Sequence, residues 1–131
     1  MLGRVILSVC LTCFLQASAS SNQRATSDQA KATPELTILF FTASWCEPCH
    51  AVAPILEKFA AKNRHCVELK AFDFDHAKAE AARWGVKQIP VVIVLSSEGK
   101  VVLRYEGATK QSLETLDSAL QDLVMRLRKG R

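Results

Sequence analysis

The chain has 131 residues, which is enough for one domain and too few for two of ordinary size. Its 17 Lys and Arg against 13 Asp and Glu give a net charge of +4, which is ordinary for a soluble domain. Charges of both signs are mixed along the sequence, so the composition gives no indication of nucleic-acid binding.

The N-terminal stretch has the pattern of a secretory signal peptide. A basic Arg4 precedes an apolar run at residues 5–15, and Ala17-Ser18-Ala19 is a small-residue exit typical of cleavage sites. We therefore expect residues 1–19 to be a signal peptide and the protein to be exported, either periplasmic or secreted. An uncleaved N-terminus acting as an anchor is the alternative, and it is the only membrane contact we expect. The apolar run is much shorter than the roughly 20 residues that span a bilayer.

Three further segments are expected after the signal peptide. Residues 20–34 are rich in Ser, Ala, Thr and Gln without apolar periodicity, which predicts a flexible leader. Residues 35–128 carry the pattern of a folded domain, and residues 129–131 form a basic tail.

Seven secondary-structure elements are predicted within residues 35–128. Apolar runs indicate strands, and apolar residues at three- and four-residue intervals indicate helices. The expected elements are a strand at 35–42, a helix at 46–63 kinked at Pro54, a strand at 67–74, a short helix at 77–83 stopped by Gly85, strands at 91–95 and 100–105 joined by a turn at 96–99, and a helix at 109–128. This order predicts an α/β fold: two parallel strands joined by a right-handed crossover, then a hairpin, in a four-stranded mixed sheet flanked by helices.

The cysteines fall into unequal groups. Cys10 and Cys13 lie inside the predicted signal peptide, so three cysteines remain in the mature chain. Cys46 and Cys49 form a Cys-x-x-Cys pair, the one candidate bridge, which indicates disulfide chemistry rather than a structural disulfide. Cys66 is expected to be structural, with a regulatory or intermolecular thiol as the alternative.

The pair lies in Trp45-Cys46-Glu47-Pro48-Cys49-His50, between the first predicted strand and the first predicted helix. The spacing puts both sulfurs on one helical face, close enough to bond. Cys46 is expected at the start of the helix as the exposed, attacking sulfur, because unpaired N–H groups there favour the thiolate. Cys49, one turn later, is expected to resolve the mixed disulfide. Pro48 fits the first turn, which does not need its N–H.

Three neighbours, Glu47, Pro48 and His50, are expected to tune the pair. The Glu47 carboxylate repels a nearby thiolate, whereas His50, when protonated, would stabilise one. The alternative for His50 is a solvated surface residue without a role.

The sequence resembles the thioredoxin family. The matching features are Trp45 before the first cysteine, Pro48 before the second, Pro54, Ile89-Pro90 and Gly107-Ala108, and the resemblance extends from about residue 36 to 124. It implies a thioredoxin-like three-layer sandwich, trimmed at the N-terminus because the leader is too short and polar for a further strand and helix. It also implies a thiol–disulfide oxidoreductase.

The resemblance implies further site residues. Ile89-Pro90 is expected to have a cis peptide bond beside the cysteines, with the Ile89 backbone binding a substrate strand. Trp45 is expected to shield the sulfurs and contact bound polypeptide, with core packing as the alternative. No cofactor is implied: the partners would be protein disulfide or dithiol substrates and a second dithiol protein, and the protein would be a monomer.

The chain departs from that family at two positions. A buried Asp and a neighbouring Lys of cytoplasmic thioredoxins correspond here to Phe40 and Ala71. Losing both together is physically coherent, since either alone would be costly to bury. Proton transfer from the resolving thiol would then depend on water, Glu47 or His50.

Two other functions compete with thiol–disulfide exchange. The run from Cys46 to His50 also fits the Cys-x-x-Cys-His pattern of c-type haem attachment, although a distal ligand is hard to find. Cys46, Cys49 and His50 could instead bind Zn or Cu(I) in a metal-binding module or metallochaperone. We favour thiol–disulfide exchange on exported proteins, in the reductive direction; the redox partner and the substrate stay open.

Overall fold

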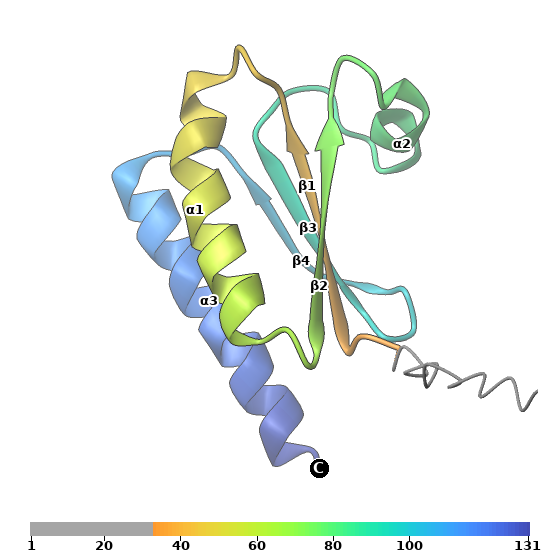
Figure 1. The fold of residues 1–131 in the computed structure, drawn as a ribbon, viewed down its shortest axis with the longest axis vertical. Coiled ribbons are helices and arrows are strands. Elements are labelled where there is room, and N and C mark those ends of the chain that lie inside the picture. The colour runs from red at the N-terminus through yellow and green to blue at the C-terminus, as the bar shows by residue number, and fades with distance from the viewer. Residues whose placement is uncertain (1–32) are drawn as a thin grey trace, which may run out of the picture. The chain divides into compact units, whose positions relative to one another are not determined.

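The computed structural model describes residues 33–131 (Figure 1), so the predicted signal peptide and all but the end of the predicted leader lie outside it. The elements are β1 (Leu36–Thr42), α1 (Glu47–Lys62), β2 (Val67–Asp73), α2 (Lys78–Arg83), β3 (Val91–Ser96), β4 (Val101–Glu106) and α3 (Lys110–Lys129). All seven predicted elements are present in the predicted order, with ends that differ by at most one residue. Lys129, expected in the basic tail, is the last residue of α3.

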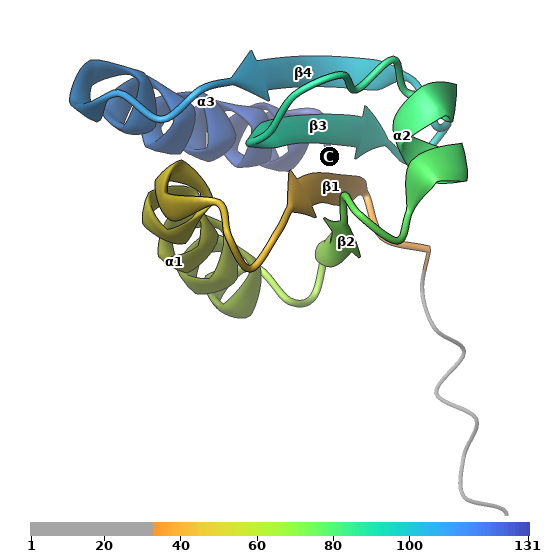
Figure 2. The ribbon, with the colours of Figure 1, turned by 90° about the horizontal axis from the view of Figure 1, so that it is seen from above.

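The strands form one mixed sheet in the order β2-β1-β3-β4. Strands β1 and β2 are parallel, and β3 is antiparallel to both β1 and β4. Helices α1 and α3 cover one face of the sheet, and the short α2 lies on the other (Figure 2). The predicted α/β three-layer sandwich is confirmed.

Strand β1 is central because it is apolar on both faces. Ile38 and Phe40 point into the core beneath α1 and α3, whereas Leu39 and Phe41 point into the core beneath α2. All four side chains are buried. A strand buried on both sides reads as a continuous apolar run rather than as an alternation, as residues 38–41 do.

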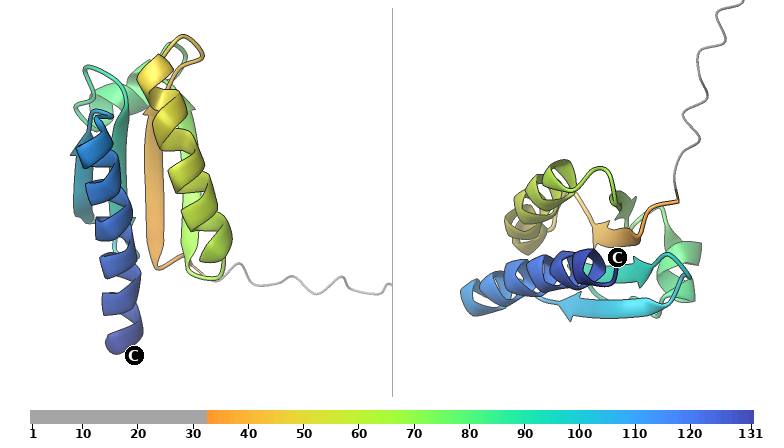
Figure 3. Two further views of the ribbon diagram at one scale, coloured as in Figure 1. Left: turned by 90° about the vertical axis from the view of Figure 1, so that its left-hand side faces the viewer. Right: turned by 90° about the horizontal axis from the view of Figure 1, so that it is seen from below.

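The apolar stripe predicted for the last helix faces the sheet. Leu116, Leu120 and Val124 are buried, while Leu113 and Leu127 pack partly buried against the same core. Helix α3 lies beside α1 along this face (Figure 3). Within residues 33–131, no helix is both long enough and apolar enough to cross a bilayer.

The sheet register brings three distant segments to one edge. The carboxyl ends of the parallel strands β1 and β2 lie together, with Thr42 paired to Asp73. Phe41 pairs with Val91 across the antiparallel ladder, so Pro90, just before β3, arrives at the same edge. The loop that carries Trp45 and Cys46 leaves β1 there, at the upper end of Figure 1.

Candidate active site

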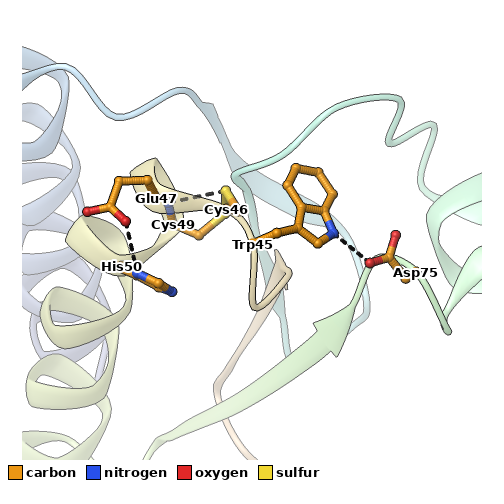
Figure 4. Close-up of a disulfide and its surroundings, with 6 residues drawn as sticks. All are labelled: Trp45, Cys46, Glu47, Cys49, His50 and Asp75. Atoms are coloured by element: carbon orange, nitrogen blue, oxygen red, sulfur yellow. Dashed lines mark hydrogen bonds and ion pairs between the residues drawn. A yellow bond between two sulfur atoms is a disulfide. The ribbon is translucent and has the colours of Figure 1, made fainter.

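The two motif cysteines form a disulfide at the start of α1 (Figure 4). Their Cα atoms are 5.3 Å apart, within the usual range for a bridge. Cys46 is the N-cap residue, and its Sγ accepts a hydrogen bond from the backbone N–H of Cys49 at 3.3 Å. The Cys46 sulfur therefore caps the start of the helix. Pro48 occupies the first turn, as predicted.

The expectation that Cys46 is exposed is wrong for this disulfide state. Cys46 is 3% exposed and Cys49 is fully buried. Both side chains belong to the core cluster under α1, together with Ala43 and Val52. Cys49 sits on the inward face of the helix, and the disulfide holds the Cys46 sulfur beside it.

Glu47 and His50 pair with each other beside the disulfide. The His50 Nδ1 lies 3.6 Å from a Glu47 carboxylate oxygen, and the two side chains are 58% and 94% exposed. Their spacing of three residues places them on one helical face. In this structure the partner of His50 is thus Glu47, and a role of either residue in tuning the pair stays a prediction.

Trp45 projects from the loop into solvent and is 63% exposed, so the core-packing alternative is wrong. Its Nε1–H donates a hydrogen bond of 2.6 Å to an Asp75 carboxylate oxygen, 30 residues further along the chain (Figure 4). The sequence analysis missed Asp75. Its position just after β2 could have predicted this contact, because the carboxyl ends of adjacent parallel strands lie at the same edge of the sheet.

Asp73 anchors the turn that carries Asp75. Its Oδ1 accepts the backbone N–H of Asp75 at 2.9 Å, and its other carboxylate oxygen lies 3.1 Å from the His76 Nδ1. The hydrogen bond from the Asp75 backbone, followed by the bond from His76, lowers the pKa of Asp73 below its ordinary value of 3.8. Asp73 is thus held as a carboxylate.

The Ile89–Pro90 peptide bond is cis, as the family resemblance implied. Pro90 is buried, and the half-buried Ile89 packs against both core clusters. The Pro90 carbonyl accepts the Gly107 N–H at 3.2 Å, and Gly107 has a φ of 93°, which favours glycine. The structure thus brings two of the matched motifs into contact. A role in binding substrate stays a prediction for Trp45, Ile89 and Pro90.

The two departures from the family are neighbours. Phe40 and Ala71 are direct partners between β1 and β2. Two neighbouring apolar residues thus take the places of the family's Asp and Lys. Next to Ala71, a cavity of about 390 Å³ opens between the strand ends and α1. Its lining residues are Thr42, Ala43, Ser44, His50, Ala71 and Asp73.

The remaining candidate residues give little to the site. Cys66 is buried and unbonded, consistent with the structural interpretation. Among residues 33–131, no group of three His, Cys, Asp or Glu side chains is placed to hold a metal ion. The metal-binding alternative therefore gains no support from this geometry, because Cys46 and Cys49 are bonded to each other.

Comparisons with known proteins agree with this geometry. The family model described as Thioredoxin matches residues 18–122. Thioredoxin H-type 1 of Nicotiana tabacum is 42% identical over 82 residues, covering 63% of this chain and 64% of that protein. The TPR repeat-containing thioredoxin TDX of Arabidopsis thaliana is 36% identical over 96 residues, covering 73% of this chain and 25% of that protein. The chain thus spans less than two thirds of either relative.

Solved structures resemble the fold. The crystal structure of thioredoxin from Trypanosoma brucei brucei superimposes with a TM-score of 0.60 at 29% identity, covering 71% of this chain and 79% of that one. Fasciola hepatica thioredoxin superimposes with a TM-score of 0.56 at 29% identity, covering 69% and 84% of the two chains.

Proposed function

Because this chain belongs to the thioredoxin family, we propose that it reduces disulfide bonds in exported proteins through Cys46 and Cys49. The observation that carries the proposal is the Cys46–Cys49 bridge at the N-cap of α1. A helix start stabilises the thiolate that thiol–disulfide exchange needs, and a partner cysteine one turn later can take over the bond.

The reaction takes two exchanges. In the reduced protein, the Cys46 thiolate attacks one sulfur of a substrate disulfide, forms a mixed disulfide and releases the first substrate thiol. The Cys49 thiolate then attacks the Cys46 sulfur, closes the bridge and releases the second substrate thiol. Two electrons pass from the cysteine pair to the substrate, and a second dithiol protein must return them.

The reductive direction is supported by the charge beside the sulfurs. Glu47 is in the first turn of α1, one residue after Cys46. A carboxylate there disfavours the thiolate form, so it destabilises the dithiol state relative to the disulfide. A protein whose reduced form is less stabilised gives up its electrons more readily.

Trp45 and the Ile89–Pro90 backbone frame the surface that we assign to the substrate. Trp45 provides an exposed aromatic ring next to Cys46, and such rings bury large areas on binding. An extended substrate segment could bond to the Ile89 backbone next to the cis proline.

Two serine variants test the roles of the sulfurs. Cys46→Ser should abolish the reduction of insulin disulfides, because the attacking thiolate is lost. Cys49→Ser should accumulate mixed disulfides that are visible on non-reducing gels, because nothing releases them. Cys66→Ser, at the buried unbonded thiol, is the matched control and should keep its activity. Insulin reduction by the Cys46→Ser chain would overturn the proposal.

The direction is tested by the reduction potential of the pair. We expect a value nearer to about −270 mV, typical of thioredoxin reductants, than to about −120 mV, typical of a strong oxidant. The measurement is equilibration with glutathione buffers, and an oxidant-like value would reverse the assigned direction.

Export is supported by the signal-peptide pattern at residues 1–19. The chain should be recovered from outside the cytosol with an intact mass that lacks these residues. Full-length protein confined to the cytosol would remove exported proteins as its substrates.

A further inference from the structure

We propose that Arg104 is a positioning residue for substrate binding. From β4, its side chain fixes the end of α2 and, through it, the place of the Ile89 backbone at the active-site edge. This inference rests on the proposed function, in which the Ile89 backbone binds a substrate segment. It deepens that function by naming the residue that holds this backbone in place.

The Arg104 guanidinium joins β4 to the end of α2. Its Nη1 donates a hydrogen bond of 2.8 Å to the Trp84 carbonyl, and its Nη2 donates one of 3.3 Å to the Gly85 carbonyl. Its Nε donates to a Glu106 carboxylate oxygen at 2.8 Å, which holds the guanidinium in place. Trp84 is the C-cap residue of α2. The cation therefore lies at a helix end, where the last carbonyls have no partner within the helix.

Strand β4 holds both ends of the segment between α2 and β3 (Figure 2). At one end, Arg104 binds the Trp84 and Gly85 carbonyls. At the other end, the N–H of Gly107, directly after β4, donates to the Pro90 carbonyl at 3.2 Å. Both anchors come from the same end of one strand, so the place of the segment depends on β4.

The middle of this segment has few contacts of its own. Val86 is buried, and its N–H donates to the Ala81 carbonyl of α2 at 2.8 Å. Among residues 33–131, no hydrogen bond involves the backbone of Lys87, Gln88 or Ile89. Apart from the packing of the Ile89 side chain, the place of this backbone follows from the anchored ends. The Ile89 N–H and C=O are therefore available to a substrate segment.

Arginine is suited to this position because its planar guanidinium presents its donors in a fixed fork. Two successive carbonyls accept from the terminal nitrogens, and Nε is left for Glu106. A lysine ammonium is a point charge on a flexible stem and cannot reproduce this arrangement. The Arg104 side chain is 36% exposed, and exposed ion pairs contribute little energy. The link therefore acts through its geometry more than through its charge.

The test compares a protein disulfide with a small one. Insulin reduction is followed at steady state with dithiothreitol as the electron donor. In Arg104→Ala, the KM for insulin should rise about fivefold, the loss expected for one hydrogen-bonded contact, with little change in kcat. The small substrate is 5,5′-dithiobis(2-nitrobenzoate), an aromatic disulfide too short to extend along the Ile89 backbone. Its rate of reaction with the reduced chain should stay the same, because the sulfurs are untouched.

Two further variants separate geometry from charge. Arg104→Lys should recover only part of the lost affinity, because one ammonium cannot bond both carbonyls in the same way. Lys100→Ala is the matched control. It removes a cation directly before β4 whose partner is Glu98 at 2.7 Å, and it should leave both reactions unchanged.

A double-mutant cycle protects the test from a general loss of stability. Glu106→Ala should raise the KM for insulin by less than Arg104→Ala does. Added to Arg104→Ala, it should raise the KM no further, because Glu106 acts through the guanidinium. All variants are assayed at a temperature below their own unfolding transitions.

An unchanged KM for insulin in Arg104→Ala would overturn the inference. So would equal losses with insulin and with the aromatic disulfide, since these would indicate a general structural effect. Full recovery in Arg104→Lys would overturn the assigned geometry. An unmodified chain that reduces neither disulfide would instead overturn the proposed function itself.

Discussion

The first turn of α1 combines three charged or polarisable groups within five residues. The helix start favours a Cys46 thiolate, Glu47 disfavours it, and His50 is drawn to Glu47 at 3.6 Å. The net effect on the sulfur is therefore a difference between opposing contributions. At the scale of the residue, we therefore expect Glu47 and His50 to adjust the reactivity of the pair in opposite directions.

Asp75 is a positioning residue for Trp45, which it holds through a hydrogen bond of 2.6 Å. Asp75→Ala should lower kcat/KM for insulin reduction by about fivefold, the equivalent of losing about 1 kcal/mol of hydrogen bonding. Asp75→Asn keeps an oxygen acceptor and should retain most of the activity. The emission of Trp45 should shift in the alanine variant alone, and equal activity loss in both variants would contradict this role.

Asp73 predicts a pH dependence of stability. Its pKa is lowered in the folded protein, so its contribution is present above the ordinary value of 3.8 and is lost as the pH falls through the folded value. Asp73→Asn should therefore reduce the free energy of unfolding at pH 7. It should also flatten the decline of that free energy between about pH 5 and about pH 2.

Urea unfolding at a series of pH values provides the measurement. Asp122→Asn, at an exposed carboxylate on α3, is the control and should follow the slope of the unmodified chain. An Asp73→Asn slope as steep as that of the unmodified chain would contradict the assignment.

At the scale of the element, α1 differs from most helices in its N-cap. Ser, Thr, Asp and Asn are the usual N-cap residues, but here a sulfur accepts the first-turn N–H. The same sulfur belongs to the disulfide, so the group that caps the start of the helix also changes its bonding each time the disulfide opens or closes. Burial of Val52, Leu56 and Phe59 on the inner face anchors the helix to the sheet independently of that sulfur.

Helix α2 is followed, two residues after its end, by a residue in the left-handed backbone conformation that favours glycine. Gly85 follows the helix with a φ of 63°, and a Cβ built there would meet no atom within 4 Å. Gly85→Ala should thus lower the free energy of unfolding by about 1 kcal/mol through backbone strain alone. Gly130→Ala, after α3 at a φ of −81°, is the matched control and should be close to neutral by thermal unfolding. Similar losses in both variants would contradict the argument.

At the scale of the whole domain, one sheet separates two cores, and the larger core includes the disulfide. Residues 33–131 place Cys46 and Cys49 in the same buried cluster as Leu116, Leu120 and Val124 of α3. The active site is therefore continuous with the packing that stabilises the fold.

Leu120→Ala tests this packing. Leu120 is fully buried between α3 and the sheet, so its truncation should lower the free energy of unfolding by about 2–5 kcal/mol. Met125→Ala, on the same helix at 55% exposure, should change it by less than about 0.5 kcal/mol. Denaturant unfolding of both variants makes the comparison, and equal effects would contradict the assigned face of α3.

The elements, their order and the pairing of the two motif cysteines could all be predicted from the sequence. Strand runs such as residues 38–41, the stripe along α3 and the Cys46–Cys49 spacing are local signals, and local geometry is sufficient to interpret them. The family resemblance placed Ala71 beside Phe40, and the two residues are direct partners between β1 and β2.

The contacts between distant side chains could not be predicted and depend on the folded arrangement of the strands and helices. The bond from Trp45 to Asp75, the cavity that His50 shares with Asp73, and the burial of Cys46 depend on the register of β1 against β2 and on the seating of α1. No local pattern encodes these contacts, since they join residues tens of positions apart. They arise only when the sheet register brings the two strand ends together beside the helix start.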